Sequence, residues 1–358
     1  MTILYYIPTT IAFFASALFY WGGIKAKHVA NFLLAILMLF LVIVVGLRYN
    51  TGSDWDQYVK LFGLKEFDFS EGGIAFYLIK VALRFFSLGI QSYVLLMFLL
   101  SMITKIIAFK RESIYYIVVF MLYLSFWYLT LEFNQIRQGA ALGFSLLSLK
   151  FIREQQLKQY LLFVFIAFAL HNSAIAFLPL YWLVRIKINR LFVYIILLIT
   201  LTLAFSGVTD RIIAFLVSSS LSDSYYTERI VSYTLDEIYN QNVLFSFTTI
   251  HKLFILIVIT ETVHRYPCDN ISQRMLLWAS LAGVVVFLLF CQYEIIATRL
   301  ALYFRSIELI SLAYLPFIFK RKKSFVILVI LYLYSIFQIN NVMSIIDNGL
   351  IPYHNFLF

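Results

Sequence analysis

Charged side chains are scarce in this sequence. They make up 13% of its 358 residues, whereas hydrophobic residues make up 63%. A soluble domain needs a far more charged surface, so that class of protein is excluded. The hydrophobic residues form blocks of about 17–20, the length of helix that spans ~30 Å of hydrocarbon. The clear blocks are 3–21, 29–47, 91–109, 113–131, 139–152, 160–184, 191–206, 245–263, 275–292, 298–319 and 324–340. The composition therefore predicts a multi-pass α-helical membrane protein.

Cysteine motifs, metal-ligand patterns and phosphate loops are also lacking. The two cysteines, Cys268 and Cys291, fit no recognisable motif and receive no role. His171 has no second histidine or cysteine within a turn or two, so we expect no metal site. No glycine-rich loop of the P-loop or dinucleotide type is present, so ATP use is not indicated and no cofactor is predicted. The N-terminus has no basic signal-peptide region, and residues 3–21 are expected to be a retained span.

The positive charge lies in short loops between the hydrophobic blocks. The net charge is +10, and basic clusters such as Lys110/Arg111 follow individual blocks. The positive-inside rule places these loops in the cytoplasm, so the charge indicates topology and not nucleic-acid binding. This orientation puts five polar segments on the outer face, namely 48–72, 132–138, 207–244, 293–297 and 341–358.

Two segments are not counted as single crossings. Residues 73–90 carry Lys80 and Arg84 one turn apart, which would cost a few kcal/mol in a lipid-exposed span, so an interfacial or re-entrant helix is expected. Residues 160–184 have basic clusters at both ends and a polar break at His171-Asn172-Ser173. We expect two short helices that meet at this break, either in a distorted bilayer or as a re-entrant hairpin.

The predicted fold class is therefore all-α. We expect a multi-pass transmembrane helix bundle of about 11–13 membrane segments, some short or re-entrant. The whole chain, residues 1–358, is expected to form one integral membrane domain, with outer segments 48–72 and 207–244.

Polar residues at the predicted outer face are the candidates for chemistry. In the first outer segment a solvated loop with a snorkelling arginine is the simpler interpretation, and it is favoured for Asp56, Lys60 and Lys65. Arg48, Asp54 and Tyr58 are harder to dismiss once the other segments are considered. Residues 132–138 read EFNQIRQ, and an arginine and a glutamate at membrane depth usually face a cavity or each other. His171 is either a hydrogen-bonded core residue or, because it coincides with a helix break, part of a cavity wall.

Two further arginines lie in the segment 294–308. Arg299, near the outer end of its span, is placed to meet a ligand. Arg305 is a second candidate, although Glu308 three residues later also suits an internal ion pair. Arginine suits phosphate because its planar guanidinium donates two parallel hydrogen bonds. A nearby carboxylate or histidine can act as a general base for a hydroxyl nucleophile. These residues predict a site for a pyrophosphate-bearing substrate at the membrane surface.

The order of these motifs resembles that of EpsG-type polysaccharide polymerases, part of the broad Wzy class. The likeness runs through Arg48-x-x-x-Gly52-Ser53-Asp54-x-x-x-Tyr58, Glu71-Gly-Gly-Ile-Ala-Phe-Tyr77, Asn134-x-x-Arg137-Gln138, Lys158-to-Pro179 and Ile351-Pro352-Tyr353. Ser53 stands where such proteins often have threonine. The segment 207–244 cannot be aligned and is a candidate for setting substrate choice.

The resemblance implies a polymerase of O-antigen, capsule or exopolysaccharide repeat units at the outer face of the bacterial cytoplasmic membrane, with a GT-C-like helix arrangement as one option for the fold. The growing glycan would pass from undecaprenyl pyrophosphate to the non-reducing end of the next lipid-linked unit. The implied partners are this lipid-linked oligosaccharide, the bilayer and a chain-length regulator, without nucleic acid, metal or cofactor.

Under this interpretation the polar residues divide into three roles. The pyrophosphate is bound by Arg48, Arg137, Arg299 and Arg305. The base is Asp54 or His171, with Glu132 as a third choice. The sugar-contacting or supporting residues are Tyr58, Asn134 and Gln138.

Other functions fit parts of the same pattern. A flippase or another transporter would carry charges within its spans, but it should show internal repeats, and the two halves show no convincing repeat. An O-antigen ligase uses the same kind of donor and is poorly separated by sequence. A membrane O-acyltransferase would place its histidine towards the cytosol, whereas His171 is expected near the outer side. A structural partner of a synthesis complex would not need buried arginines.

Overall fold

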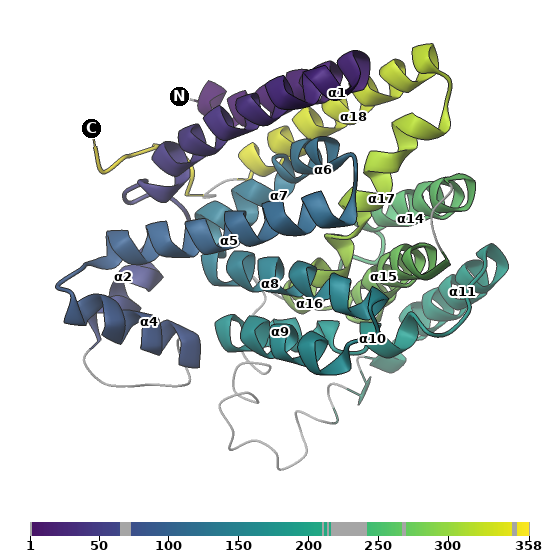
Figure 1. Ribbon diagram of the computed structural model, residues 1–358. Coiled ribbons are helices and arrows are strands. Elements are labelled where there is room, and N and C mark those ends of the chain that lie inside the picture. The colour runs from purple at the N-terminus through teal and green to yellow at the C-terminus, as the bar shows by residue number, and fades with distance from the viewer. Residues whose placement is uncertain are drawn as a thin grey trace. The chain divides into compact units, whose positions relative to one another are not determined.

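Figure 1 shows the computed structural model, which describes residues 2–64, 73–209, 211–212, 215, 242–266, 270–345 and 349–357. The regular structure of these residues is helical. They contain no strand, and a single antiparallel β-bridge joins Arg48 to Asn355. The all-α prediction is therefore confirmed for this part of the chain. Most of the predicted outer segment 207–244 lies outside the described residues, as do Glu71 and Cys268.

The chain divides into two compact units, each of which is described by itself. Unit 1 comprises Met1–Ile175 and Ala313–Phe358, and unit 2 comprises Ala176–Leu312. Across the described residues, six helices are long and apolar enough to cross a membrane. A seventh candidate is the pair Glu294–Arg305 and Glu308–Ile318, which is bent by 48° at its break. Shorter apolar helices accompany them, so the prediction of a multi-pass bundle with some short segments is confirmed.

Unit 1 contains most of the helices, with η marking 3-10 and π-helices. In chain order they are η1 (Thr2–Tyr5), α1 (Ile7–Leu41), η2 (Val42–Gly46), α2 (Trp55–Gly63), α4 (Ile74–Phe85), α5 (Ile90–Glu112), α6 (Tyr116–Tyr123), α7 (Phe126–Tyr128), η3 (Leu129–Asn134), α8 (Ile136–Arg153), α9 (Leu157–Leu170), η5 (Leu315–Ile318) and α18 (Arg321–Met343).

Helix α1 contains two spans and reverses between them. Its 35 residues would extend about 52 Å if straight. Yet Tyr5, which precedes α1, packs edge-to-face against Tyr353, whose hydroxyl donates to Val44 O beyond its other end. The chain must therefore turn back between the candidate spans Thr2–Gly22 and Ala26–Gly46. This hairpin agrees with the two separate blocks expected from the sequence.

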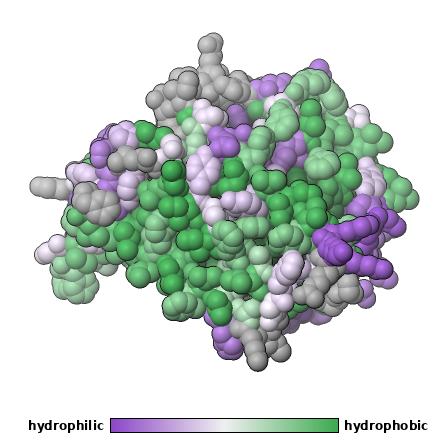
Figure 2. All heavy atoms as spheres, turned by 90° about the horizontal axis from the view of Figure 1, so that it is seen from above, coloured by the Kyte–Doolittle hydropathy of each residue, from purple (hydrophilic) through white to green (hydrophobic). Residues whose placement is uncertain are grey.

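The first and last long helices of unit 1 lie side by side (Figure 1). Phe13 stacks on Tyr332 with ring centroids 4.4 Å apart, and Trp21 meets Phe325 edge-to-face at 5.3 Å. Other large apolar side chains of α1 and α18 are exposed, among them Phe14, Phe32, Leu39, Ile330 and Leu333. Figure 2 looks down on this side of the molecule and shows broad hydrophobic areas. Exposed apolar surface of this extent fits contact with lipid.

Helices α5, α8 and α9 form the densest packing in unit 1. Two glycines of α8, Gly139 and Gly143, face Ser101 and Thr104 of α5. A Cβ atom on Gly143 would lie 1.9 Å from the Thr104 hydroxyl oxygen, and one on Gly139 would lie 3.2 Å from the Ser101 hydroxyl oxygen. This spacing is the G-x-x-x-G pattern, in which small residues allow membrane helices to approach closely.

Helix α4 occupies the segment that the sequence marked as interfacial or re-entrant. Its 12 residues extend about 18 Å, which is too short to span ~30 Å of hydrocarbon. Lys80 donates to the backbone carbonyls of Leu61 and Leu64 at the end of α2, and Arg84 donates to that of Phe62. The two charges therefore satisfy the exposed carbonyls of a neighbouring helix end.

Two predicted hydrophobic blocks are interrupted. The block 113–131 becomes α6, α7 and the π-helix η3, and Thr9 of α1 donates to Leu124 O where α6 ends. The block 160–184 breaks as predicted at His171, whose backbone is extended (φ −156°, ψ 121°). Its second half is not the predicted helix, because a 3-10 turn, η4 (Asn172–Phe177), and the four-residue α10 (Leu180–Leu183) follow.

Unit 2 is arranged around one buried helix. It contains α10, α11 (Arg190–Ser206), α14 (Phe247–Arg265), α15 (Asn270–Leu289) and α16 (Glu294–Arg305), and its boundary falls within η4 and α17 (Glu308–Tyr314). Helix α15 contacts α10, α11, α14 and α16. Trp278 of α15 donates to Ile186 O at 2.9 Å, which fixes the loop before α11.

Candidate functional site

The loop between η2 and α2 is held by contacts that require glycine. Gly52 has φ +108°, and its N–H donates to Gly349 O at 2.6 Å. A Cβ atom here would lie 2.3 Å from Phe133 O, so both the conformation and the close approach favour glycine. The next N–H, of Ser53, donates to Asn134 Oδ1 at 2.9 Å. Asn134 therefore supports the loop from η3 and is a positioning residue in this geometry.

This loop places Asp54 and Tyr58 one helical turn apart at the start of α2. Asp54 is half-buried and accepts a hydrogen bond from Ser53 Oγ at 3.3 Å. Tyr58 is only 5% exposed. Burial raises the pKa of Tyr58 above its usual value, so its hydroxyl is protonated at neutral pH and can donate as well as accept.

Arg137, in the first turn of α8, lies beside these two residues. Its guanidinium carbon is 5.9 Å from the Tyr58 ring centroid and 5.8 Å from that of Phe76. It donates a hydrogen bond to Tyr58 and interacts electrostatically with Asp54 and Tyr93. The predicted Arg137, Tyr58 and Asp54 are therefore together, with an aromatic wall behind the arginine.

The next residue of α8, Gln138, connects this group to His171. Gln138 Nε2 donates to Ser173 Oγ at 3.2 Å, and Ser173 Oγ lies 2.6 Å from His171 Nδ1. When Nδ1 carries the proton and donates it to Ser173, Nε2 keeps its lone pair and can act as a base. We call Asp54, Tyr58, Arg137, Gln138, Ser173 and His171 the polar cluster. Its members come from α2, α8 and the break after α9.

The side chain of Arg48 donates its hydrogen bonds to backbone carbonyl oxygens. Its side chain is 1% exposed and donates through Nε to Thr51 O, through Nη1 to Val45 O and through Nη2 to Phe133 O, at 2.9–3.0 Å. The guanidinium also lies over the Phe133 ring. Burial lowers the pKa of Arg48 to about 10, so it remains charged at neutral pH. This geometry favours a positioning role for Arg48, which joins the loop before α2 to η3, over direct contact with pyrophosphate.

Glu132 lies on η3 in a fully buried ion pair. Its Oε1 accepts from Lys105 Nζ at 2.7 Å and from Ser101 Oγ at 2.8 Å, and also from Tyr123. Lys105 donates in addition to Gly139 O at 2.8 Å. In the part of the chain that the structure describes, Glu132 Oε2 finds no hydrogen-bond partner. The pair joins α5 to η3 and α8, which favours a structural role for Glu132.

The C-terminal segment, residues 349–357, packs on the loop between η2 and α2. Tyr49 N–H donates to His354 O at 3.0 Å, and Phe356 N–H donates to Leu47 O at 2.8 Å. Thr51 Oγ1 accepts from His354 N–H at 2.9 Å. The Ile351-Pro352-Tyr353 motif thus belongs to a segment that fixes the loop leading to Asp54 and Tyr58.

Unit 2 contains the other two candidate arginines. Arg305 Nε lies 3.5 Å from Glu308 Oε2, the ion pair that the sequence offered as one interpretation. Lys252 of α14 lies over the Phe287 ring at 3.5 Å and interacts electrostatically with Arg305 and Glu308. Arg299 is half-buried on α16.

Several partners were not predicted from the sequence. Lys105 and Lys252 sit inside hydrophobic blocks, and an ionisable residue within a span is itself a signal of function or pairing. Ser101 and Tyr123 carry no such signal, because serine and tyrosine are common in membrane helices. Ser173 lies in the predicted polar break, but its contacts with Gln138 and His171 were not predicted. The residues that the structure describes contain no group of three or more His, Cys, Asp or Glu side chains that could hold a metal ion.

Fold and cluster together define a multi-pass membrane protein with a polar site of arginine, tyrosine, carboxylate and histidine beside its helix breaks. The chain belongs to the EpsG family, whose model matches residues 31–355. Neither the curated proteins nor the solved structures contain a match to this chain. Membership confirms the predicted family and supports a general function as a polysaccharide polymerase of the glycosyltransferase type.

Proposed function

We propose that this protein joins oligosaccharide repeat units that are carried on undecaprenyl pyrophosphate. The reaction would take place at the outer face of the bacterial cytoplasmic membrane and transfer the growing glycan to the next lipid-linked unit. The observation that carries the proposal is the polar cluster, in which Arg137 and the Gln138–Ser173–His171 chain project from successive residues of one helix start.

The chemistry asks for one cationic group and one base. The bond between sugar C1 and the pyrophosphate oxygen breaks, and a bond between C1 and the acceptor oxygen forms. The acceptor proton goes to the base, and the lipid pyrophosphate leaves with the electron pair. Arginine hydrogen bonds that strengthen as charge develops on the leaving group lower the barrier.

In this proposal Arg137 binds the departing pyrophosphate and His171 Nε2 accepts the proton, with Asp54 as the alternative base. Arg48 and Asn134 position the loop, and the Lys105–Glu132 pair holds η3. Arg299, in unit 2, stays a predicted pyrophosphate ligand that is tested separately. Arg305 is assigned to its ion pair with Glu308, which leaves direct contact with pyrophosphate to Arg137 and Arg299. The sugar partners of Tyr58 and Gln138 and a chain-length regulator as protein partner belong to the same proposal.

The first experiment is a deletion strain complemented with the wild-type gene, with its surface polysaccharide separated on a gel. Deletion is expected to leave single repeat units and to remove the ladder of longer chains. If single units disappear as well, the defect lies in flipping or ligation, and the polymerase proposal is wrong. Asp56→Asn, at an exposed position of α2, serves as a control variant that should complement fully.

The base assignment is tested with membranes that contain the protein and purified lipid-linked units. His171→Ala should lower the initial rate by ~10²–10⁴-fold, the usual contribution of a general base. Ser173→Ala should lower it less and alter the pH profile, because the ring keeps its nitrogens but loses the partner of Nδ1. Ser173→Thr, which keeps the hydroxyl, should restore the profile. An undiminished rate for His171→Ala would transfer the role to Asp54, and Asp54→Asn would then be the inactive variant.

A further inference from the structure

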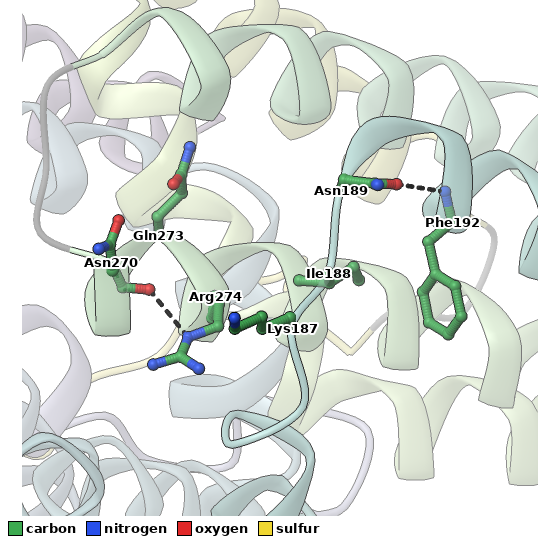
Figure 3. Close-up of a pocket in the computed structure, with 7 residues that line it drawn as sticks. All are labelled: Lys187, Ile188, Asn189, Phe192, Asn270, Gln273 and Arg274. Atoms are coloured by element: carbon green, nitrogen blue, oxygen red, sulfur yellow. Dashed lines mark hydrogen bonds between the residues drawn. The ribbon is translucent and has the colours of Figure 1, made fainter.

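A cavity of about 510 Å³ opens in unit 2, and none of its lining residues belongs to the polar cluster. Its walls come from the loop before α11 and from the first turns of α15 (Figure 3). Polar side chains dominate the lining, namely Lys187, Asn189, Asn270, Gln273 and Arg274. Among the described lining residues two are cationic and none is acidic.

Arg274 is held in place at the wall of this cavity. Its Nε donates to Asn270 O at 3.1 Å, and its Nη1 donates to Arg185 O at 3.3 Å (Figure 3 shows the first of these). These bonds fix the plane of the guanidinium before any ligand arrives. Lys187 is exposed and adds a second, mobile cation. A fixed guanidinium next to a flexible ammonium is well suited to the oxygens of a phosphate group.

Glu261 of α14, close to the start of α11, is already paired with cations that lie outside the cavity lining. Glu261 lies 3.3 Å from Arg190 and 3.8 Å from Arg265. Its charge is therefore shared with two arginines that do not line the cavity.

The remaining wall is apolar and continues into a surface that faces outward. Ile188 and Phe192 complete the lining. Beyond them, α11 exposes Leu191, Ile195 and Leu198, with exposed fractions of 67%, 45% and 67%. A cationic cavity that borders an exposed apolar helix face matches an amphiphile with an anionic head and an acyl chain.

We infer that this cavity binds a phosphate-bearing anion, with the phosphate on Lys187 and Arg274. The adjoining apolar face of α11 favours the head group of an anionic phospholipid over a free phosphate ester. The positive-inside pattern puts the loops 185–190 and 264–274 at the cytoplasmic side, so the lipid would come from the inner leaflet. Such a site differs in ligand and in predicted membrane face from the proposed polymerase site.

The test uses the full-length protein, purified in neutral detergent and depleted of lipid. Phosphatidylglycerol is added, and phosphatidylcholine, whose head group carries no net charge, is the control lipid. Bound lipid is counted by native mass spectrometry, and the melting temperature is recorded in parallel. Three proteins are compared: the wild type, Lys187→Gln/Arg274→Gln, and Lys322→Gln/Lys323→Gln. The last pair is exposed at the start of α18 and removes the same charge on the same predicted face.

The wild type and the α18 control should retain phosphatidylglycerol and gain melting temperature, whereas the cavity variant should retain at least several-fold less. Equal retention by the cavity variant, or an equal loss in the control, would overturn the inference. If sn-glycerol 3-phosphate or inorganic phosphate raises the melting temperature as much as phosphatidylglycerol does, the lipid assignment is wrong and the ligand is a free phosphate. Lys187→Glu, a single change at an exposed position, gives a second measurement should the double variant fold poorly, and it should also lose retention.

Discussion

Individual buried cations of this protein have distinct partners. Arg48 donates to three backbone carbonyls, Lys105 forms an ion pair with Glu132, and Arg137 lies beside Tyr58 and Asp54. The sequence identifies such residues, since a charge in an apolar context is costly and needs a reason. It does not identify the partners on other helices, which are Phe133 for Arg48, Glu132 for Lys105 and Tyr58 for Arg137.

The Lys105–Glu132 pair can be tested as a structural element. Lys105→Met should lower the free energy of unfolding by about 3–5 kcal/mol, because it leaves a buried carboxylate without its counter-charge. Lys105→Met/Glu132→Gln should recover part of this loss, because no net charge is then buried. Thermal unfolding of the purified protein in detergent measures both.

The opposite pattern would restore Glu132 to the catalytic candidates. In that case Glu132→Gln alone would remove polymer and leave the melting temperature unchanged. The ladder on the gel and the melting curve, recorded for the same variant, therefore separate the two roles.

At the scale of helices, hydropathy predicts where they are and not where they break. The blocks 29–47, 91–109 and 324–340 correspond to long helical segments, because uninterrupted apolar sequence in lipid must satisfy its backbone within a helix. The block 113–131 carries no charge, yet it is broken. The block 298–319, which carries Arg299, Arg305 and Glu308, is broken as well. The first break coincides with a hydrogen bond from Thr9, a residue more than a hundred positions away.

The candidate site shows the same division. Asp54, Tyr58, Arg137, Gln138 and His171 could be selected from the sequence, because they are polar residues at the ends or breaks of apolar blocks. The sequence could not predict that these residues lie together. Their proximity depends on Ser173, which contacts both Gln138 and His171, and on the order in which α2, α8 and α9 pack. Asn134 and Arg48 also stand out in the sequence, and their contacts in the structure hold the loop before α2.

Close packing of α5 and α8 leads to a second prediction. Gly143→Ala should reduce the amount of folded protein and its melting temperature, because its Cβ atom would lie 1.9 Å from the Thr104 hydroxyl oxygen and 2.9 Å from Thr104 Cβ. Thr104→Gly should partly rescue this variant by removing both atoms. Gly63→Ala is the matched control, since no atom lies within 4 Å of its added Cβ. Equal loss in the control would mean that glycine content, and not this contact, limits folding.

At the scale of the whole molecule, the candidate arginines are divided between the two units. Arg137 belongs to unit 1 and Arg299 to unit 2. If each of these arginines is needed to bind pyrophosphate, as the sequence predicts, Arg137→Ala and Arg299→Ala should each shorten the polysaccharide ladder at normal protein levels. Arg137→Lys should retain more activity than Arg137→Ala, because it keeps the charge but not the planar donors.

The control for this comparison is Lys323→Gln, an exposed basic residue outside the proposed site. A full-length ladder with Arg299→Ala, together with a lost ladder with Arg137→Ala, would confine pyrophosphate binding to unit 1. Full-length ladders with both variants would show that the pyrophosphate assignment is wrong.

The hydrogen bonds between the loop before α2 and the C-terminal segment, here called the clasp, have a consequence for biosynthesis. Thr51 and His354 are 303 residues apart in the chain. At ~5–20 residues per second, the ribosome needs about 15–60 s to make the residues between them. During that time the loop that carries Asp54 and Tyr58 is already made but lacks its clasp. The site is therefore completed late in translation, and a partly synthesised chain would not yet hold this loop in its final position.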